Sequence, residues 1–364
     1  MRGDTTRQVR MLAITPDQLV PEDHPIRAIK PIVDRALAEL SPLFERIYAR
    51  GGRPSIPPEH LLKAQLLMAL FSIPSARRFC DQLQYNMLFK WFLDLNVDDP
   101  AFHASTFSKN QERLLSQDVA RRFLLQLVEE ARRCGLLSGD HFTVDGTLLD
   151  AWASMKSLRP KGEDGDGRPP AGKNPDVDYR GQRRTNGTHV STTDPEARLA
   201  RKGAGQPARL CLAGHVLMEH RSGLAVEVQV TRAVGAPEWE VALGMLDRLP
   251  RSGHKTVAGD RAYDTKGFVA GCRERGITPH VAQYPATARR RSAIDGRTTR
   301  HPSYRRSQRW RKRVEEIFGW VKTVGGGRKL RFIGVARNQA WAELTVAAYN
   351  LVRMARLGSR PAPA

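Results

Sequence analysis

The segment 309–322, RWRKRVEEIFGWVK, combines an acid and two cations on one side of a predicted helix. At about 100° per residue, Glu315 lies about 40° from Arg311 and about 20° from Lys322, at the margin of the apolar stripe. Glu316 points the opposite way, into solvent. One carboxylate is thus held at a core edge between two cations, although an amphipathic helix with an i,i+4 ion pair has the same pattern. The buried stripe is formed by Trp310, Val314, Ile317, Phe318 and Val321.

Two further acids occur where strands are predicted. Asp145 lies in HFTVDGTLLD (141–150), which alternates like a strand, and Asp260 ends the strand KTVAGD (255–260). Together with Glu315 they could converge on Mg²⁺ or Mn²⁺, since these ions prefer carboxylate oxygens. Two such ions about 3.5–4 Å apart can drive displacement at a phosphodiester.

Each acid also has a plainer interpretation. Asp145 and the glycine after it could form a hairpin turn, and Asp260 could cap a helix. Glu315 could form an ion pair with Arg311 and have no further role. The occurrence of all three acids in this order, in a chain of net charge +21, favours the common site.

The elements that must position these acids follow the order of an RNase H-like core. Residues 138–283 read as strand, strands, helix, strand, helix and strand, and a helix is predicted over 306–322. We therefore expect a mixed α+β (α/β) fold, with an RNase H-like catalytic domain over 138–358 that carries a β-rich insertion. Residues 156–185 are rich in Pro, Gly and charge, which predicts a mobile loop.

Residues 1–135 are predicted to form an all-α N-terminal domain. Helices are expected over 59–71, 76–95, 107–115 and 117–135, the first beginning near Pro57 and Pro58. Short helices joined by tight turns suit a helix-turn-helix that binds DNA, and equally a plain bundle or a dimerisation domain.

The charge and composition of the chain limit the kinds of partner and compartment that we expect. The chain has 59 Lys and Arg against 38 Asp and Glu, an excess that indicates a polyanionic partner, first of all nucleic acid. No apolar run approaches the length of a membrane span, and the N-terminus lacks the apolar run of a signal peptide. The four cysteines are far apart, as in a reducing compartment. We expect a cytoplasmic, nucleoid-associated protein that does not engage a membrane.

The motifs around the three acids resemble those of a DDE transposase from a bacterial insertion sequence, in the group typified by insertion sequence five (the four/five-like group). FTVDGT resembles the motif of the first Asp, GDRAYDT (259–265) that of the second, and 309–322 the signature of the Glu. Arg311, Glu315 and Lys322 keep the family spacing, whereas Gln308 stands where the family has Tyr.

This resemblance implies roles for the residues. Asp145 would bridge two metal ions, Asp260 and Glu315 would each complete one site, and Arg311 and Lys322 would hold DNA phosphates. The implied function is metal-dependent cleavage at insertion-sequence ends and strand transfer into target DNA, by a homodimer on terminal inverted repeats. The alternatives are an RNase H-like nuclease that does not join DNA and a non-catalytic DNA-binding protein derived from a transposase.

A basic run precedes and overlaps the helix of Glu315. Residues 289–313 hold eleven Arg or Lys against one acid. A solvated surface is the plain interpretation of a charge run, but beside a phosphodiester site it favours a DNA track with interleaved aromatics. We expect much of it to be loop. The predicted DNA-contacting residues here are Arg289, Arg290, Arg291, Arg305, Arg306, Arg309 and Trp310.

Overall fold

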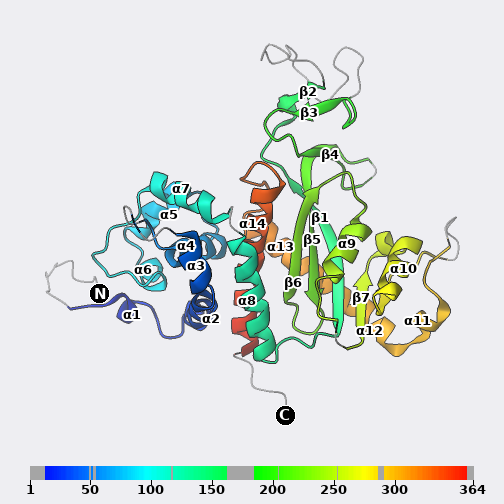
Figure 1. Ribbon diagram of the computed structural model, residues 1–364, viewed down its shortest axis with the longest axis horizontal. Coiled ribbons are helices and arrows are strands. Elements are labelled where there is room, and N and C mark those ends of the chain that lie inside the picture. Colours follow the sequence, from blue (N-terminus) through cyan, green and yellow to red (C-terminus); the bar gives the residue numbers. More distant parts are fainter. Residues whose placement is uncertain are drawn as a thin grey trace, which may run out of the picture.

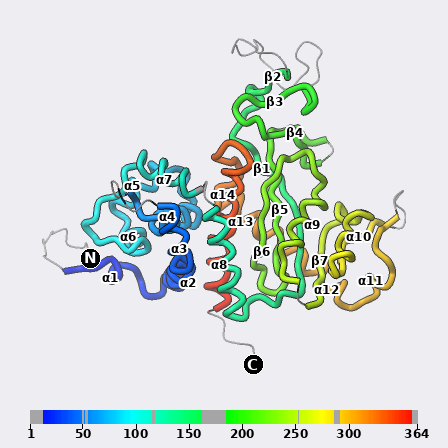
Figure 2. The backbone as a smooth tube through the Cα atoms, viewed as in Figure 1, coloured from blue at the N-terminus to red at the C-terminus, as the bar shows by residue number. Residues whose placement is uncertain are grey.

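The computed structural model describes residues 13–48, 51, 55–115, 118–161, 184–203, 205–251, 253–285 and 291–358. In Figures 1 and 2, a group of helices lies on one side, a twisted sheet on the other, and two long helices run side by side between them. The helices that precede the sheet are α1 (Pro16–Leu19), α2 (Ile26–Ala38), α3 (Ser41–Ile47), α4 (Pro58–Leu70), α5 (Ala76–Leu83), α6 (Met87–Phe92), α7 (Ala104–Leu115) and α8 (Val119–Arg133).

The expected helix 76–95 is in fact two helices, α5 and α6. Ser75 caps α5 by accepting from the Arg78 amide, and Asn86 caps α6 by accepting from the Phe89 amide at 3.3 Å. The Asn86 side chain satisfies a backbone donor that a continuous helix would have used, so the chain turns at this point.

The main sheet has the strand order of an RNase H-like core. The long strand β5 (Arg209–Glu219) pairs antiparallel with β6 (Ala225–Arg232) on one edge and with β1 (His141–Asp150) on the other. On its far side β1 pairs in parallel with β7 (Lys255–Gly259), and β7 pairs in parallel with β8 (Ile277–Val281). Since β1 continues without a break through residues 145 and 146, the hairpin-turn alternative for Asp145 is wrong.

A β-rich insertion separates β1 from β5. It contains the 3₁₀ turn η1 (Met155–Ser157), the paired strands β2 (Leu158–Pro160) and β3 (His189–Ser191), and β4 (Arg198–Ala200), which pairs with the start of β5. In Figure 1 β2 and β3 project from the top of the sheet. Most of the loop predicted over 156–185 lies outside the described residues.

The two faces of β1 meet different helices because side chains alternate along a strand. Phe142 and Val144 pack with residues of α9 (Glu238–Leu246) and α10 (Lys266–Glu274). Leu149, on the opposite face, belongs to the cluster that includes α13 (Val314–Thr323) and α14 (Val335–Gly358). Asp145 is four residues before Leu149, so its side chain lies on the same face of β1 as Leu149.

One hydrophobic cluster joins the N-terminal helices to the sheet. Helix α14 packs against α2, α4, α8 and β6, and the cluster runs from Leu61 and Phe123 through Val346 to Val228. The helical region is therefore fastened to the sheet through a buried apolar contact, which α14 supplies from the end of the described chain.

The segment 291–323 differs from its prediction in two ways. Instead of mostly loop, the basic run contains α11 (Gly296–Arg300) and α12 (Pro302–Trp310). Instead of one continuous helix over 306–322, the 3₁₀ turn η3 (Arg311–Arg313) separates α12 from α13. A 3₁₀ turn advances about 120° per residue, so the angle between Arg311 and the residues of α13 differs from that of an ideal α-helix. The predicted apolar stripe is nevertheless buried at Val314, Ile317 and Val321.

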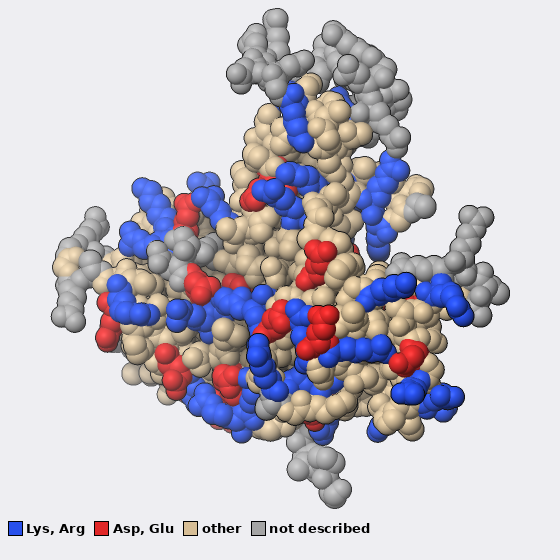
Figure 3. Space-filling view, turned by 45° about the vertical axis from the view of Figure 1, so that its right-hand side comes forward, with Lys and Arg blue, Asp and Glu red and all other residues tan. Residues whose placement is uncertain are grey.

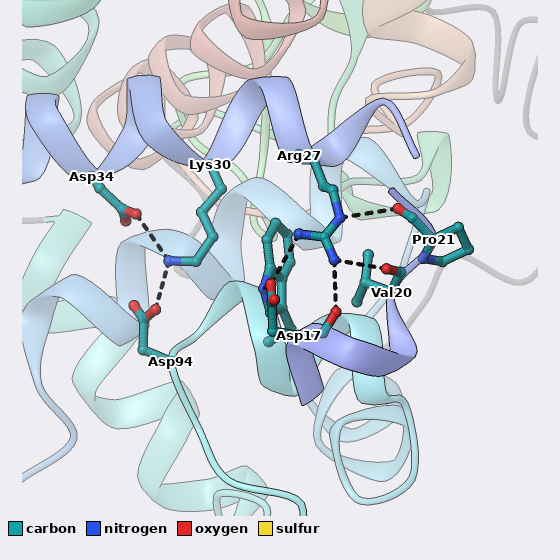
Figure 4. A network of polar contacts seen from close by, with 8 residues as sticks. Asp17, Val20, Pro21, Arg27, Lys30, Asp34 and Asp94 are labelled. Atoms are coloured by element: carbon teal, nitrogen blue, oxygen red, sulfur yellow. Dashed lines mark hydrogen bonds and ion pairs between the residues drawn. The ribbon is translucent and has the colours of Figure 1, made fainter. Parts of the chain in front are cut away.

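Charged side chains of the N-terminal helices form a compact network (Figure 4). Lys63 is only 3% exposed and its ammonium pairs with Asp34 at 2.6 Å and with Asp94. Lys30 pairs with the same two carboxylates, at 2.9 and 2.6 Å. Each carboxylate here therefore faces two cations.

Candidate active site

The first two predicted acids lie side by side where β7 leaves β1. The parallel pairing of these strands ends at Thr143 and Ala258. Asp145 stands two residues after Thr143 on β1, and Asp260 stands two residues after Ala258, directly after the last residue of β7. The two acids therefore occupy matching positions at the carboxyl end of β7. Open α/β sheets bind ligands at this kind of edge.

Asp145 is half-buried, and the Gly146 amide donates to its Oδ1 at 2.8 Å. Burial raises the pKa of the Asp145 carboxyl to about 6, and the nearby negative charges of Asp260 and Glu238 act in the same direction. The Gly146 amide and the guanidinium of Arg311 oppose this rise. Asp145 thus lies in a locally negative environment that favours a bound cation.

Asp260 both caps a turn and faces Asp145. It caps the 3₁₀ turn η2 (Arg261–Tyr263), since its Oδ1 accepts from the Ala262 amide at 2.7 Å, so the capping interpretation describes its geometry correctly. The cap also fixes the carboxylate beside Asp145, to which it couples electrostatically. Capping and membership of the site are therefore compatible.

The residues that follow Asp260 hold the surrounding chain in place. Tyr263 is 1% exposed and packs on Gly259, where a Cβ would lie 3.0 Å from its ring. The fully buried Asp264 accepts from the amides of Tyr284 at 3.0 Å and Ala293 at 2.8 Å. The motif GDRAYDT therefore contains one residue that faces the site and two that position its walls.

Helix α13 runs beside the face of β1 that bears Asp145. The Lys322 ammonium donates to Thr147 Oγ1 at 2.6 Å, and Arg311, just before α13, lies within electrostatic reach of Asp145. Glu315 lies between these two anchors in sequence and two turns before Lys322, so it falls on the same side of the helix. Its side chain is exposed.

The neighbouring acid Glu316 has a different partner. Its Oε2 lies 3.1 Å from the Arg353 guanidinium of α14. In the described part of the chain no ion pair involves Glu315. Its carboxylate therefore has its oxygens available, whereas that of Glu316 is tied to α14.

The donor set suits a divalent cation by its chemistry, although it does not form a preassembled cluster. Within the residues that the structure describes, no three His, Cys, Asp or Glu side chains gather closely enough to form a ready-made metal site. Asp145 and Asp260 nevertheless offer hard oxygen ligands, and their mutual repulsion is the kind that a divalent cation relieves. These residues fit the expected metal.

The predicted DNA-contacting residues fall into three groups. Arg291 and, on α12, Arg305, Arg306 and Arg309 are exposed, as a phosphate track requires. Arg289 and Arg290 lie outside the described residues. Arg311 and Lys322 are half-buried, and the buried Nε of Arg311 has no hydrogen-bond partner among the described groups.

Trp310 lies at a cavity rather than on an open surface. Its ring carries the Arg313 guanidinium at 4.4 Å from the centroid. The cavity beside it has a volume of about 240 Å³ and is lined by His141, His220, Arg221, Ser303, Arg306, Ser307 and Trp310. One ring face is thus engaged within the protein, which restricts how Trp310 can stack on a base.

Lys and Arg side chains are not confined to the basic run. Figure 3 shows them across the whole visible face, with Asp and Glu interspersed. Within the described residues no helix is long and apolar enough to cross a bilayer.

Sequence reasoning missed one acid of this neighbourhood, Glu238, the first residue of α9. Burial raises the pKa of its carboxyl, and the charge of Asp260 raises it further. Only the pairing of β1 with β5 and the return of the chain through β6 bring α9 to Asp145, and no local motif announces that proximity.

Comparison with known families identifies this arrangement. Residues 14–113 match the family described as "Transposase domain (DUF772)", and residues 186–351 match the "Transposase DDE domain". The second matched range contains Asp260 and Glu315 but begins after Asp145. Among curated proteins, no sequence matches the chain.

Similar solved structures include two transposases. The piggyBac transposase synaptic complex with hairpin DNA overlaps 93% of this chain and 77% of its own, at 11% identity and a TM-score of 0.43. The Mos1 transposase paired-end complex with left transposon end overlaps 64% of this chain and 61% of its own, at 10% identity and a TM-score of 0.20.

The chain belongs to the DDE transposases, because the two transposase families match in tandem over most of its length and the sheet has the RNase H-like order. It is a polynucleotidyl transferase that acts on DNA in transposition, and membership of this family implies a divalent metal.

Proposed function

We propose that the protein is the transposase of an insertion sequence in the five-like group, and that Asp145, Asp260 and Glu315 are its catalytic carboxylates. The observation that carries this proposal is the matched position of Asp145 and Asp260 beyond the last β1–β7 pair. Glu315 is supported by its location between the Arg311 and Lys322 anchors on the helix beside β1.

We assign the metal ligands to these three carboxylates, with Mg²⁺ or Mn²⁺ as two ions. When bound, such ions activate the attacking oxygen and stabilise the leaving oxygen of a phosphodiester. Asp145 would be shared because it lies near Asp260 and on the strand that α13 contacts. The burial that raises its pKa also strengthens its interaction with a cation, since surrounding water is excluded.

The cations of the site would hold the DNA backbone. The Lys322 ammonium is oriented by its hydrogen bond to Thr147, and burial lowers its pKa. When a phosphate binds, Lys322 would exchange this neutral hydroxyl partner for an anion, which makes a stronger hydrogen bond. The Nε–H of Arg311 has no hydrogen-bond partner among the described groups, and it would donate a hydrogen bond to a phosphate oxygen. The exposed arginines of α12 would extend this path away from the cut.

In this scheme water attacks first and frees a 3′-hydroxyl at the end of the element. That 3′-hydroxyl then attacks a target phosphodiester, so that the bond to target DNA forms as the target strand breaks. We further propose that a homodimer holds two terminal inverted repeats, since both ends must be joined to one target.

A joining assay tests the proposal. Purified protein is incubated with a plasmid target and either uncut or pre-cut end DNA, in Mg²⁺, in Mn²⁺ or in EDTA. We expect joined product only with the divalent ions. Cleavage without joining would support the nuclease alternative, and DNA binding without either product would support the non-catalytic alternative.

A further inference from the structure

The central strand β1 carries a glycine directly after the catalytic candidate Asp145. A Cβ at Gly146 would lie 3.3 Å from the Glu238 carboxyl carbon and 3.4 Å from Glu238 Oε1. The same Cβ would lie 3.2 Å from Nδ1 of His215, the residue paired with Gly146 across β1 and β5. The missing side chain thus leaves the space in which Glu238 and His215 approach the strand.

His215 is built into this space. Its side chain is 2% exposed, and its Nε2 is engaged by Thr231 Oγ1 at 3.0 Å. Among the described groups, its Nδ1 has no hydrogen-bond partner. A buried ring nitrogen without a partner costs free energy, and this one lies beside Gly146, on the side of the strand where the Glu238 carboxyl group also lies.

Glu238 is held there by the packing of its own helix. The next residue, Trp239, covers Gly267 of α10 so closely that a Cβ on this glycine would lie 2.6 Å from the Trp239 ring. Pro237 precedes the helix, so the chain enters α9 with a restricted backbone. The side chain itself reaches solvent at the mouth of the site.

We propose that Glu238 is a fourth metal-facing carboxylate of the active site, which joins Asp145 and Asp260 from the α9 side through the space that Gly146 leaves open. Glu315 approaches from the opposite helix layer, on α13. This proposal rests on the proposed metal site at Asp145. It predicts that the ion near Asp260 is held more strongly than two aspartates alone would hold it.

The test is Mn²⁺ binding by the full-length protein, measured by isothermal titration calorimetry without DNA. We expect Glu238→Gln to raise the Mn²⁺ dissociation constant by about tenfold or more, since the change removes the charge and keeps the size. Glu240→Gln is the matched control, because Glu240 is an exposed acid in the same turn of α9, and it should stay within about twofold.

Asp145→Asn separates failure of this inference from failure of the proposed function. If Asp145→Asn abolishes Mn²⁺ binding and Glu238→Gln binds like the wild type, Glu238 is a surface acid and the inference is overturned. If Asp145→Asn also binds like the wild type, the metal site at Asp145 is wrong and both proposals fall.

Gly146→Ala provides an independent variant. The added methyl group would meet both Nδ1 of His215 and the Glu238 carboxyl, so we expect Mn²⁺ binding to weaken while DNA binding without metal persists. Unchanged Mn²⁺ affinity in Gly146→Ala protein would contradict the proposed approach of Glu238 to the metal across this glycine.

Discussion

Two clusters of charge in this molecule have opposite balances. In the N-terminal network, Lys30 and Lys63 each pair with both Asp34 and Asp94. Figure 4 shows the two contacts of Lys30. Burial alone would raise the pKa of Asp94, but hydrogen bonds from the two lysines lower it below its usual value. The charges of that network are compensated within the protein.

At the sheet edge the carboxylates face one another instead. Asp260 and Glu238 add to the effect of burial on Asp145, and the pKa of Asp145 is raised rather than lowered. The half-buried Arg311 is the cation that opposes this. Acids whose charge is neutralised by neighbouring lysines stabilise the fold. Acids that face other acids need a cation from outside the protein, so we assign the first cluster a structural role and the second a functional one.

The largest expected effect concerns the uncompensated cluster. Asp145→Asn, Asp260→Asn and Glu315→Gln should each reduce cleavage of end DNA by about a thousandfold or more, because each removes a metal-ligand charge. DNA binding should remain near the wild-type level, as measured by electrophoretic mobility shift. Glu316→Gln is the matched control for Glu315 and should stay within about twofold. An inactive Glu316→Gln beside an active Glu315→Gln would mean that the wrong acid has been assigned.

The compensated cluster should respond through stability. Lys63→Met leaves Asp34 and Asp94 with Lys30 alone, and we expect the free energy of unfolding to fall by roughly 2 kcal/mol. The value lies below that of a fully buried pair because both carboxylates are partly exposed. Urea denaturation measures it, with Lys312→Met as an exposed control that should change by less than about 0.5 kcal/mol. Equal effects of the two substitutions would remove the distinction between the clusters.

The pH dependence of the metal-free protein gives a third contrast. The pKa of Asp145 is about 6 in the fold against an ordinary 3.8, so its protonated form stabilises the fold. That contribution is fully present below 3.8 and is lost as pH rises through about 6. In EDTA, Asp145→Asn should therefore be more stable than wild type at neutral pH, by about 1–2 kcal/mol, and lose this advantage in acid. Calorimetry at several pH values measures the difference, and a destabilised variant at neutral pH would contradict the predicted sign.

The smallest effect is expected at the DNA track. Replacing Arg305, Arg306 and Arg309 with Ala should lower the slope of log affinity against log salt by about 0.9 for each phosphate that an arginine no longer neutralises. Specific and random DNA should weaken alike, because arginines that bind phosphates do not read sequence. Arg275→Ala is the control, since Asp247 already compensates that arginine at 2.7 Å. An unchanged slope in the α12 variant would place the DNA elsewhere, most simply on the N-terminal helices.

The sequence predicted the parts of this architecture that depend on local pattern. The strands around Asp145 and before Asp260 follow from their alternation and their apolar run, and the buried stripe through Ile317 from its helical period. The break at Arg311–Arg313 escaped prediction because a 3₁₀ turn keeps nearly the same apolar spacing. Glu238 also escaped, since its closeness to Gly146 arises from strand pairing between distant segments.

We predict above all that Asp145, Asp260 and Glu315 hold one metal centre. The most direct test is a structure of the protein with end DNA and Mn²⁺, with the ions located by anomalous scattering. We predict anomalous peaks at the β1–β7 edge, with oxygens of all three carboxylates within about 2.6 Å of an ion. Peaks that lack Asp145 or Glu315 as ligands, or that lie away from this edge, would contradict the claim.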